Sequence, residues 1–234
     1  VDLVAARGTF LAAGLGAGIG LGAVVPTARR PESEVAPVGV GGPTVRAVAR
    51  LNRRPLVGAG IFGLLAMATR EGRMVLLPLV GVALELSASS IGLLVATGYT
   101  ADLLLFPVSG MVMDRFGRLA AMVPAYGLLA VGLLLLLLAK STFGVLTAGL
   151  VMGVGNGLSS GSLFTLGSDL APKEGAAAYF AAVSLVTDGG RVLGPVLVGA
   201  VAGTWGLDAA AATLAGVMAL GLLWLVVVVG ETGP

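Results

Sequence analysis

Long apolar segments alternate with short polar turns along most of this chain. About seven of them reach the 20 or so mostly apolar residues that a helix needs to cross a bilayer. They lie at roughly 4–25, 56–84, 90–112, 119–138, 142–167, 176–203 and 207–230. The pattern predicts an all-α, polytopic membrane protein with about seven transmembrane helices.

One long polar interruption divides these segments. Residues 26–55 combine Pro, Gly and Arg with little apolar periodicity, which predicts a linker between membrane modules. The linker separates a lone first span from a compact group of six spans. Its last part, 45–54, is compatible with a short amphipathic helix at the membrane surface.

The composition excludes a water-soluble fold. Hydrophobic residues make up 57% of the chain and charged residues only 11%, whereas soluble domains carry about 25% charge. The chain has neither cysteine nor histidine, so disulfides, zinc sites and histidine catalysis are excluded. No nucleophile-and-base spacing appears among the remaining side chains. We therefore expect no metal, no cofactor and no enzymatic activity.

Basic residues near the span ends are unevenly distributed between the two sides of the predicted membrane. Lys and Arg concentrate in loops facing the cytoplasm, so the richer side is predicted to be cytoplasmic. That side includes the linker and the chain end, in a plasma membrane protein. It carries Arg29, Arg30, Arg46, Arg50, Arg53, Arg54, Arg115, Arg118 and Lys173, against Arg7 and Lys140 on the other side.

The turn after the third span carries a distinctive motif. Gly110, Asp114, Arg115, Gly117 and Arg118 stand in the sequence GMVMDRFGR. It resembles the G-x-x-x-D-R-x-G-R signature of the major facilitator superfamily, which lies between the second and third helices of each six-helix half. The resemblance implies that Asp114 and Arg118 belong to a charge network that latches the gate. We expect Gly110 to let helices approach and Gly117 to permit a tight turn. The competing interpretation is a basic loop that only obeys the positive-inside rule.

The ends of two spans strengthen this resemblance. The sequence VPTAR at 25–29 is similar to the P-E-T-R close of the family's sixth helix, and GETG at 230–233 to the close of the twelfth. Residues 1–25 would then be the last helix of an N-terminal half, 26–55 the cytoplasmic central linker, and 56–234 the C-terminal six-helix half. Because the chain begins at Val1, we expect a piece of a longer transporter, with the missing N-terminal half as its partner.

Seven polar positions inside the predicted spans are candidates for a substrate or ion cavity. A charge at mid-bilayer costs at least about 2.5 kcal/mol, so such residues usually face a wet cavity or a partner. The alternative is structural ion pairing, for example between Asp102 and Arg73. The three carboxylates are the plausible proton carriers, with Asp102 or Glu71 preferred. The candidates are Arg70, Glu71, Arg73, Asp102, Asn156, Asp188 and Arg191.

A glycine and proline pattern marks the sixth span. Residues 189–199 read GGRVLGPVLVG and resemble the G-x-x-x-G-P motif that drug antiporters of this superfamily carry in their fifth helix. We expect a kink at Gly194 and Pro195, and close helix crossing at Gly190, Gly194 and Gly199. The resemblance favours efflux.

Together these features suggest a secondary transporter with alternating access, which exports drugs or small metabolites by proton coupling. Its expected partners are the bilayer, a small-molecule substrate and the proton, with no nucleic acid. One alternative is a symporter that imports an organic anion bound by Arg70, Arg73 or Arg191. Another is a non-transporting receptor or scaffold with the same fold.

Overall fold

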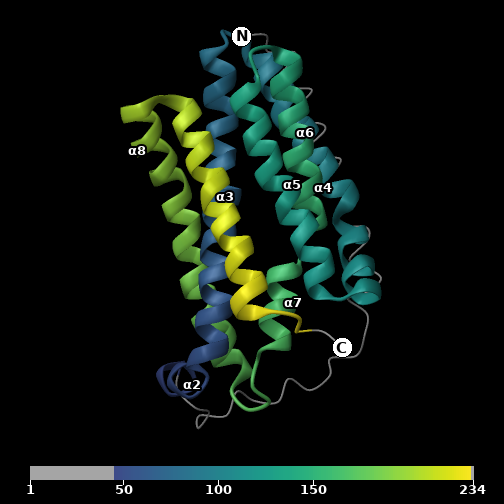
Figure 1. Cartoon of the computed structure of the whole chain (residues 1–234), viewed down its shortest axis with the longest axis vertical. Helices are drawn as coiled ribbons and strands as arrows, with labels where there is room; N and C mark the ends of the chain where they lie inside the picture. Colours follow the sequence, from purple (N-terminus) through teal and green to yellow (C-terminus); the bar gives the residue numbers. More distant parts are fainter. Residues whose placement is uncertain (1–44, 233–234) are drawn as a thin grey trace, which may run out of the picture. The chain divides into compact units, whose positions relative to one another are not determined.

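The computed structural model describes residues 45–232, and every regular element within them is a helix (Figure 1). The predicted first span, 4–25, and linker residues 26–44 lie outside this part of the chain. The elements are α2 (Val45–Leu51), α3 (Arg53–Ala83), α4 (Ala88–Phe116), α5 (Arg118–Leu138), α6 (Thr142–Leu158), α7 (Ser162–Asp169), α8 (Ala176–Trp224) and the π-helical turn η2 (Leu225–Val229).

Two breaks set the number of spans in the described region. α6 and α7 form one span, 142–169, interrupted at Ser159–Gly161, where Gly161 has a left-handed φ of 80°. α8 is two spans, because Gly206 (φ 89°, ψ 171°) turns the chain back on itself (Figure 1). Only glycine adopts such angles readily. Six span-length segments thus run from residue 53 to residue 229, close to the predicted bounds.

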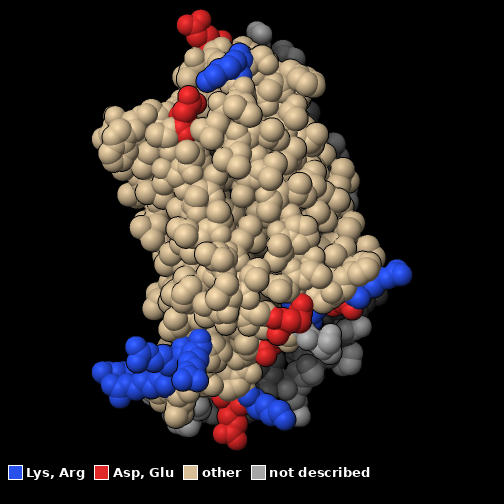
Figure 2. Space-filling view, viewed as in Figure 1, with Lys and Arg blue, Asp and Glu red and all other residues tan. Residues whose placement is uncertain are grey.

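These segments have the length and composition of membrane helices. Five of them are long and apolar enough to cross a bilayer. The remaining one, α3, has 31 residues, but Arg70, Glu71 and Arg73 interrupt its apolar sequence. Figure 2 shows that charged side chains on the visible face gather at the two ends, with an uncharged surface between them. The prediction of an all-α polytopic membrane fold is confirmed for the described residues.

Helices α3 and α8 make the most extensive contact of the bundle. At Gly190 and Gly194 an added Cβ would collide with the carbonyl oxygens of Leu64 and Ala68 on α3. Because these glycines are four residues apart, they share one helix face and let the two backbones touch. An added Cβ at Gly199 meets nothing within 4 Å among the described residues, so a close crossing there stays a prediction.

The expected kink at Gly194 and Pro195 involves no break in helical backbone angles. Within α8, the non-helical angles occur at Gly206. A proline can bend a helix without leaving the helical region, because it removes a hydrogen bond and crowds the preceding turn. The kink therefore stays a prediction.

Serine caps define where two of the spans begin. Ser87 accepts a hydrogen bond from the Ser90 amide at the start of α4, and Ser141 accepts one from Gly144 at the start of α6. Such caps satisfy amides that the first helical turn leaves free. Both spans start at the end of the bundle that also holds Lys140 and Glu85. We call this the Lys140 end, and the opposite end, with α2 and the DRFGR turn, the Arg118 end.

Candidate functional site

The first candidate site is a polar cluster inside the bundle, centred on Asp102 of α4. Asn156 of α6 donates a hydrogen bond from its side-chain amide to Asp102 Oδ2. Ser160 donates to Asp102 Oδ1 at 3.3 Å. The Arg73 guanidinium of α3 lies 3.9 Å from Oδ2, and its side chain is only 8% exposed. The carboxylate therefore has an amide, a hydroxyl and a cation as partners.

Glycines of α6 bring these side chains together. An added Cβ at Gly157 would lie 2.6 Å from the Asp102 carbonyl oxygen, and one at Gly153 would collide with Gly98 of α4. Gly155, on the other side of α6, packs equally closely on Leu129 of α5. The GVGNG sequence lets α6 lie against two helices at once, because glycine has no side chain to hold them apart. Asn156 is thereby placed beside Asp102.

The break between α6 and α7 supplies a second polar element that sequence reasoning missed. Ser109 of α4 donates to the Ser160 carbonyl at 2.7 Å, and Tyr126 shares a 3.1 Å hydrogen bond with Ser162. The first of these bonds satisfies a backbone carbonyl that the broken helix leaves open in an apolar bundle, and the second joins two side-chain hydroxyls beside the break. The signal was present in the SSGS sequence after Asn156, since clustered serines next to glycine favour a helix break.

Two polar atoms of the cluster remain without hydrogen-bond partners among the described residues. They are Arg73 Nε and Asn156 Oδ1, both fully buried. A cavity of about 30 Å³ lies beside Arg73, lined also by Met74 and Tyr99. This space is large enough for a water molecule, which needs at least about 10–15 Å³ on this measure. The cluster thus has room and unused polar capacity for one more small polar partner.

The second candidate site is the charged network at the Arg118 end. Arg118 pairs through Nε with Asp169 at 3.0 Å and through Nη1 with Asp114 at 3.1 Å. Thr232 donates to the same Asp169 oxygen at 3.3 Å. Arg118 therefore connects the end of α4 to the end of α7 and to the chain's last described residues.

The chain end also caps α5. The carboxylate of Glu231 accepts hydrogen bonds from the backbone amides of Arg118 (2.8 Å) and Leu119 (3.0 Å). The preceding residue, Gly117, has a φ of 90° and offers no side chain as a cap. A carboxylate at this position also interacts favourably with the helix dipole. Neither Glu231 nor Asp169 was predicted as a partner, because each is distant in sequence from the motif.

The remaining motif residues behave differently from one another. Gly117 makes the tight turn that the sequence predicted, joining α4 to α5 with a positive φ of 90°. An added Cβ at Gly110 meets no described atom within 4 Å, so its predicted helix contact does not exist in the described region. Arg115 stacks on the ring of its neighbour Phe116, with 5.6 Å between the guanidinium carbon and the ring centre. It takes no part in the Arg118 network.

Asp188 and Arg191 form a third charged group, on the first span of α8. They pair at 3.3 Å within one helix face and are 57% and 55% exposed. They line a crevice of about 60 Å³ with Met67 of α3 and Phe164 of α7. The structure thus brings together Arg73, Asp102 and Asn156 in one cluster, and Asp188 with Arg191 in another. Arg70 and Glu71 form no ion pair with a described residue.

Metal binding finds no support in the described residues. Within residues 45–232 there is no group of three or more Asp or Glu side chains placed to hold an ion. The acidic side chains are paired with Arg, Lys, Asn, Ser, Thr or backbone amides where contacts are seen.

Comparison with known proteins agrees with this architecture. The model of the Major Facilitator Superfamily matches residues 59–234. Two crystal structures of tetrameric PepTSo2 share the fold, in the I4 form with TM-score 0.65 and 20% identity and in the P4212 form with TM-score 0.62 and 22% identity.

The two structural matches each extend over only part of the solved PepTSo2 chain. The match to PepTSo2 covers 76% of this chain and 41% or 40% of the solved chains, so the present chain spans about two fifths of their length. A search of curated protein sequences finds no match. The family model matches residues 59–234, which are most of the chain. The chain therefore belongs to the Major Facilitator Superfamily.

Proposed function

We propose that this chain is the C-terminal half of a secondary transporter that exports drugs or small metabolites, driven by the proton gradient. The observation that carries the proposal is Asp102, a carboxylate held inside an apolar helix bundle by Arg73, Asn156 and Ser160. A charge inside a membrane bundle is costly and usually functional.

Proton binding to Asp102 would change the charge balance between three helices. Protonation removes the negative charge opposite Arg73 and leaves a largely buried guanidinium without its counter-ion. An uncompensated buried charge is strongly unfavourable, so α3 and α4 would favour another arrangement. The proton and the conformation are coupled in this way, because each state of the carboxylate stabilises a different packing.

The Arg118 network suits a gate at one end of the transporter. Arg118 holds α4 and α7 through two carboxylates, and Glu231 ties the chain end to α5. Any rocking motion that separates these helices must break charge-assisted hydrogen bonds, which are about twice as strong as neutral ones. We propose that the network stabilises the conformation in which this end is closed, and that this end is cytoplasmic.

Asp188 and Arg191 suggest which face meets the rest of the transporter. Both are more than half exposed near the middle of a span, where contact with lipid tails would be costly. The first span of α8 is also among the least buried of the described spans. We propose that this face borders the transport cavity, opposite the N-terminal half, and that Arg70 and Glu71 contribute to the same cavity.

The experiment is flux in proteoliposomes made with the gene product that contains this chain. An imposed proton gradient should drive transport of a cationic drug, and Asp102→Asn should reduce gradient-driven flux at least about tenfold while substrate exchange continues. Asp208→Asn is the matched control, because Asp208 is 73% exposed and pairs with Lys140 at the surface. Wild-type flux that is unchanged when the gradient collapses would overturn the proton coupling.

Import of an organic anion is the second candidate. Arg70 has no ion pair among the described residues, and Arg73 Nε has no hydrogen-bond partner there, so both have capacity for a carboxylate or phosphate. Loss of organic-anion binding in Arg70→Ala, with cationic drugs still bound, would favour this function. A receptor or scaffold would instead show no flux in the wild type, and Asp102→Asn and Asp188→Asn would change nothing in that measurement.

A further inference from the structure

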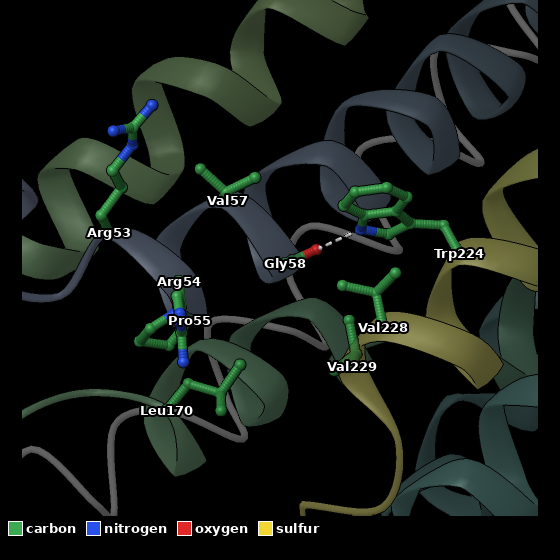
Figure 3. A pocket seen from close by; sticks show the side chains of 9 residues that line it. All are labelled: Arg53, Arg54, Pro55, Val57, Gly58, Leu170, Trp224, Val228 and Val229. Atoms are coloured by element: carbon green, nitrogen blue, oxygen red, sulfur yellow. Dashed lines mark hydrogen bonds between the residues drawn. The ribbon is translucent and has the colours of Figure 1, made fainter.

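A cavity of about 620 Å³ opens at the Arg118 end, away from the Asp102 cluster. Figure 3 shows that the first residues of α3 form one side of it, with Leu170 below and with the end of α8 and η2 opposite. Arg53 and Arg54 project from α3 in different directions at its mouth (Figure 3). Trp224, Val228 and Val229 form the apolar side. The cavity is therefore charged at one edge and apolar within.

An apolar groove continues from this cavity along the bundle. It has a volume of about 410 Å³ and is lined by Leu65 of α3 and by Leu220, Leu223 and Val227 of the last span. Trp224 and Val228 line both the cavity and the groove, so the two spaces adjoin. The residues recur at three- and four-residue intervals and share one helix face. From Leu220 to Val228 the groove runs about 12 Å along the helix, at about 1.5 Å per residue.

Trp224 lies where the cavity and the groove meet. Its indole nitrogen donates a hydrogen bond to the Gly58 carbonyl at 3.1 Å, which orients the ring across the space between α3 and α8 (Figure 3). Tryptophan is enriched at the boundary between lipid headgroups and acyl chains, because its ring is apolar and its N–H is polar. We infer that the cavity lies at headgroup depth and the groove at acyl-chain depth.

The mouth of the cavity belongs to a strongly basic surface. The blue group at the lower left of Figure 2 lies over α2 and the start of α3, which carry Arg46, Arg50, Arg53 and Arg54. None of the four pairs with an acidic side chain of the described residues, and no described acidic residue lines the cavity. Guanidinium groups bind phosphate oxygens through paired hydrogen bonds, so this surface complements an anionic headgroup.

We propose that this cavity and groove bind one anionic phospholipid from the adjacent leaflet. The phosphate lies at Arg53 and Arg54, and an acyl chain follows the groove past Trp224 to Leu220. The site does not depend on transport activity, because none of its residues belongs to the Asp102 cluster or to the Arg118 network. A lipid bound here differs from ordinary boundary lipid because binding requires a negative headgroup at the arginines and, at the same time, an acyl chain in the groove.

Native mass spectrometry of the full chain in detergent micelles tests the site, with dioleoyl phosphatidylglycerol and phosphatidylcholine as probes. Salt of about 0.15 M screens charges more than about 8 Å apart, so distant arginines contribute little. We expect one phosphatidylglycerol to bind and phosphatidylcholine to bind at least tenfold more weakly. Arg53→Ala with Arg54→Ala should weaken phosphatidylglycerol about 30-fold, from roughly fivefold per basic residue.

Two controls separate this site from general attraction. Arg46→Ala with Arg50→Ala removes the same charge from the same surface but from outside the cavity, and should change affinity less than threefold. Val228→Trp keeps all four arginines and fills the junction, and should lower phosphatidylglycerol binding at least tenfold. Val196→Trp, at an exposed position elsewhere on α8, should leave phosphatidylglycerol binding unchanged.

Several results would overturn the proposal. One is an equal loss of phosphatidylglycerol affinity in the two double-arginine variants. Another is equal binding of phosphatidylglycerol and phosphatidylcholine, and a third is displacement of the lipid by millimolar inorganic phosphate. If the Arg53 and Arg54 variant does not fold, Val228→Trp decides alone, and unchanged binding in that variant also overturns the site.

Discussion

Asp102 is held by side chains from three separate parts of the fold. Arg73 comes from α3, Asn156 from α6 and Ser160 from the break after α6, and all lie 29 to 58 positions away in sequence. Since Arg73 is 8% and Asp102 18% exposed, water does little to stabilise either charge. Removing one partner leaves the other as an unpaired charge in an apolar bundle.

A double-mutant cycle measures this coupling. Arg73→Met and Asp102→Asn should each lower the free energy of unfolding by about 3 kcal/mol, whereas the double variant should lose less than the sum by at least about 1 kcal/mol. Unfolding in detergent micelles, followed by circular dichroism, gives the values. The control cycle is Lys140→Met with Asp208→Asn, a pair about three-quarters exposed, which should couple by less than about 1 kcal/mol. Strict additivity at Arg73 and Asp102 would show that the two charges do not interact.

At the scale of helices, glycine positions decide which faces meet. α8 presents Gly190 and Gly194 to the backbone of α3, while an added Cβ at Gly199 of the same helix meets no described atom within 4 Å. Overpacking a tight contact forces backbone shifts, whereas an alanine in open space replaces glycine in a helix at little cost.

Gly194→Ala should therefore lower the free energy of unfolding by about 1–3 kcal/mol, because its methyl group collides with the Ala68 carbonyl. Gly199→Ala is the matched control and should stay within about 0.5 kcal/mol of wild type or be slightly more stable. Thermal unfolding of both variants in the same detergent compares them. Equal stability of the two would contradict the packing described here.

The start of α5 depends on a residue more than a hundred positions away. Gly117 cannot cap the helix with a side chain, and Glu231 accepts from the first two amides instead. Such a cap contributes about 1 kcal/mol.

Glu231→Ala should accelerate hydrogen exchange of the Arg118 and Leu119 amides about fivefold, the factor that corresponds to 1 kcal/mol of local opening. Exchange followed by mass spectrometry of the α4–α5 peptide reads both amides. Glu174→Ala, an exposed carboxylate in the α7–α8 connection, serves as the control and should leave that peptide unchanged. Faster exchange in both variants would point to general loosening instead of a lost cap.

At the scale of the whole described bundle, six spans bring its first and last helices to the same end. The start of α3, the α4–α5 turn, the α7–α8 connection and the close of η2 all lie at the Arg118 end (Figure 1). Arg and Lys are enriched there, and the positive-inside rule predicts that this end faces the cytoplasm.

Cysteine labelling tests this topology cleanly, because the chain has no cysteine of its own. Arg115→Cys and Lys173→Cys should react with a membrane-impermeant maleimide only in inside-out vesicles, and Glu85→Cys and Lys140→Cys only in right-side-out vesicles. Any cysteines outside this chain are first replaced by serine. If Arg115→Cys and Lys173→Cys are labelled from opposite sides of the membrane, the six-span order is wrong. If all four cysteines are labelled from the side opposite to the one expected, the span order holds and the predicted orientation is wrong.

The sequence alone determined the class of protein, the spans from residue 56 onward, the turn at Gly117 and the family. Each depends on local information: a segment of about twenty apolar residues is long enough to cross a bilayer as a helix, and a glycine between two helices can adopt the positive φ that a tight turn needs. Only the tertiary structure decided that Arg73, and not Arg70, pairs with Asp102, that Asp169 and Glu231 complete the Arg118 network, and that Gly190 and Gly194 contact the α3 backbone. Those outcomes depend on which helix faces meet, and the faces are chosen by close backbone contacts between residues far apart in the chain.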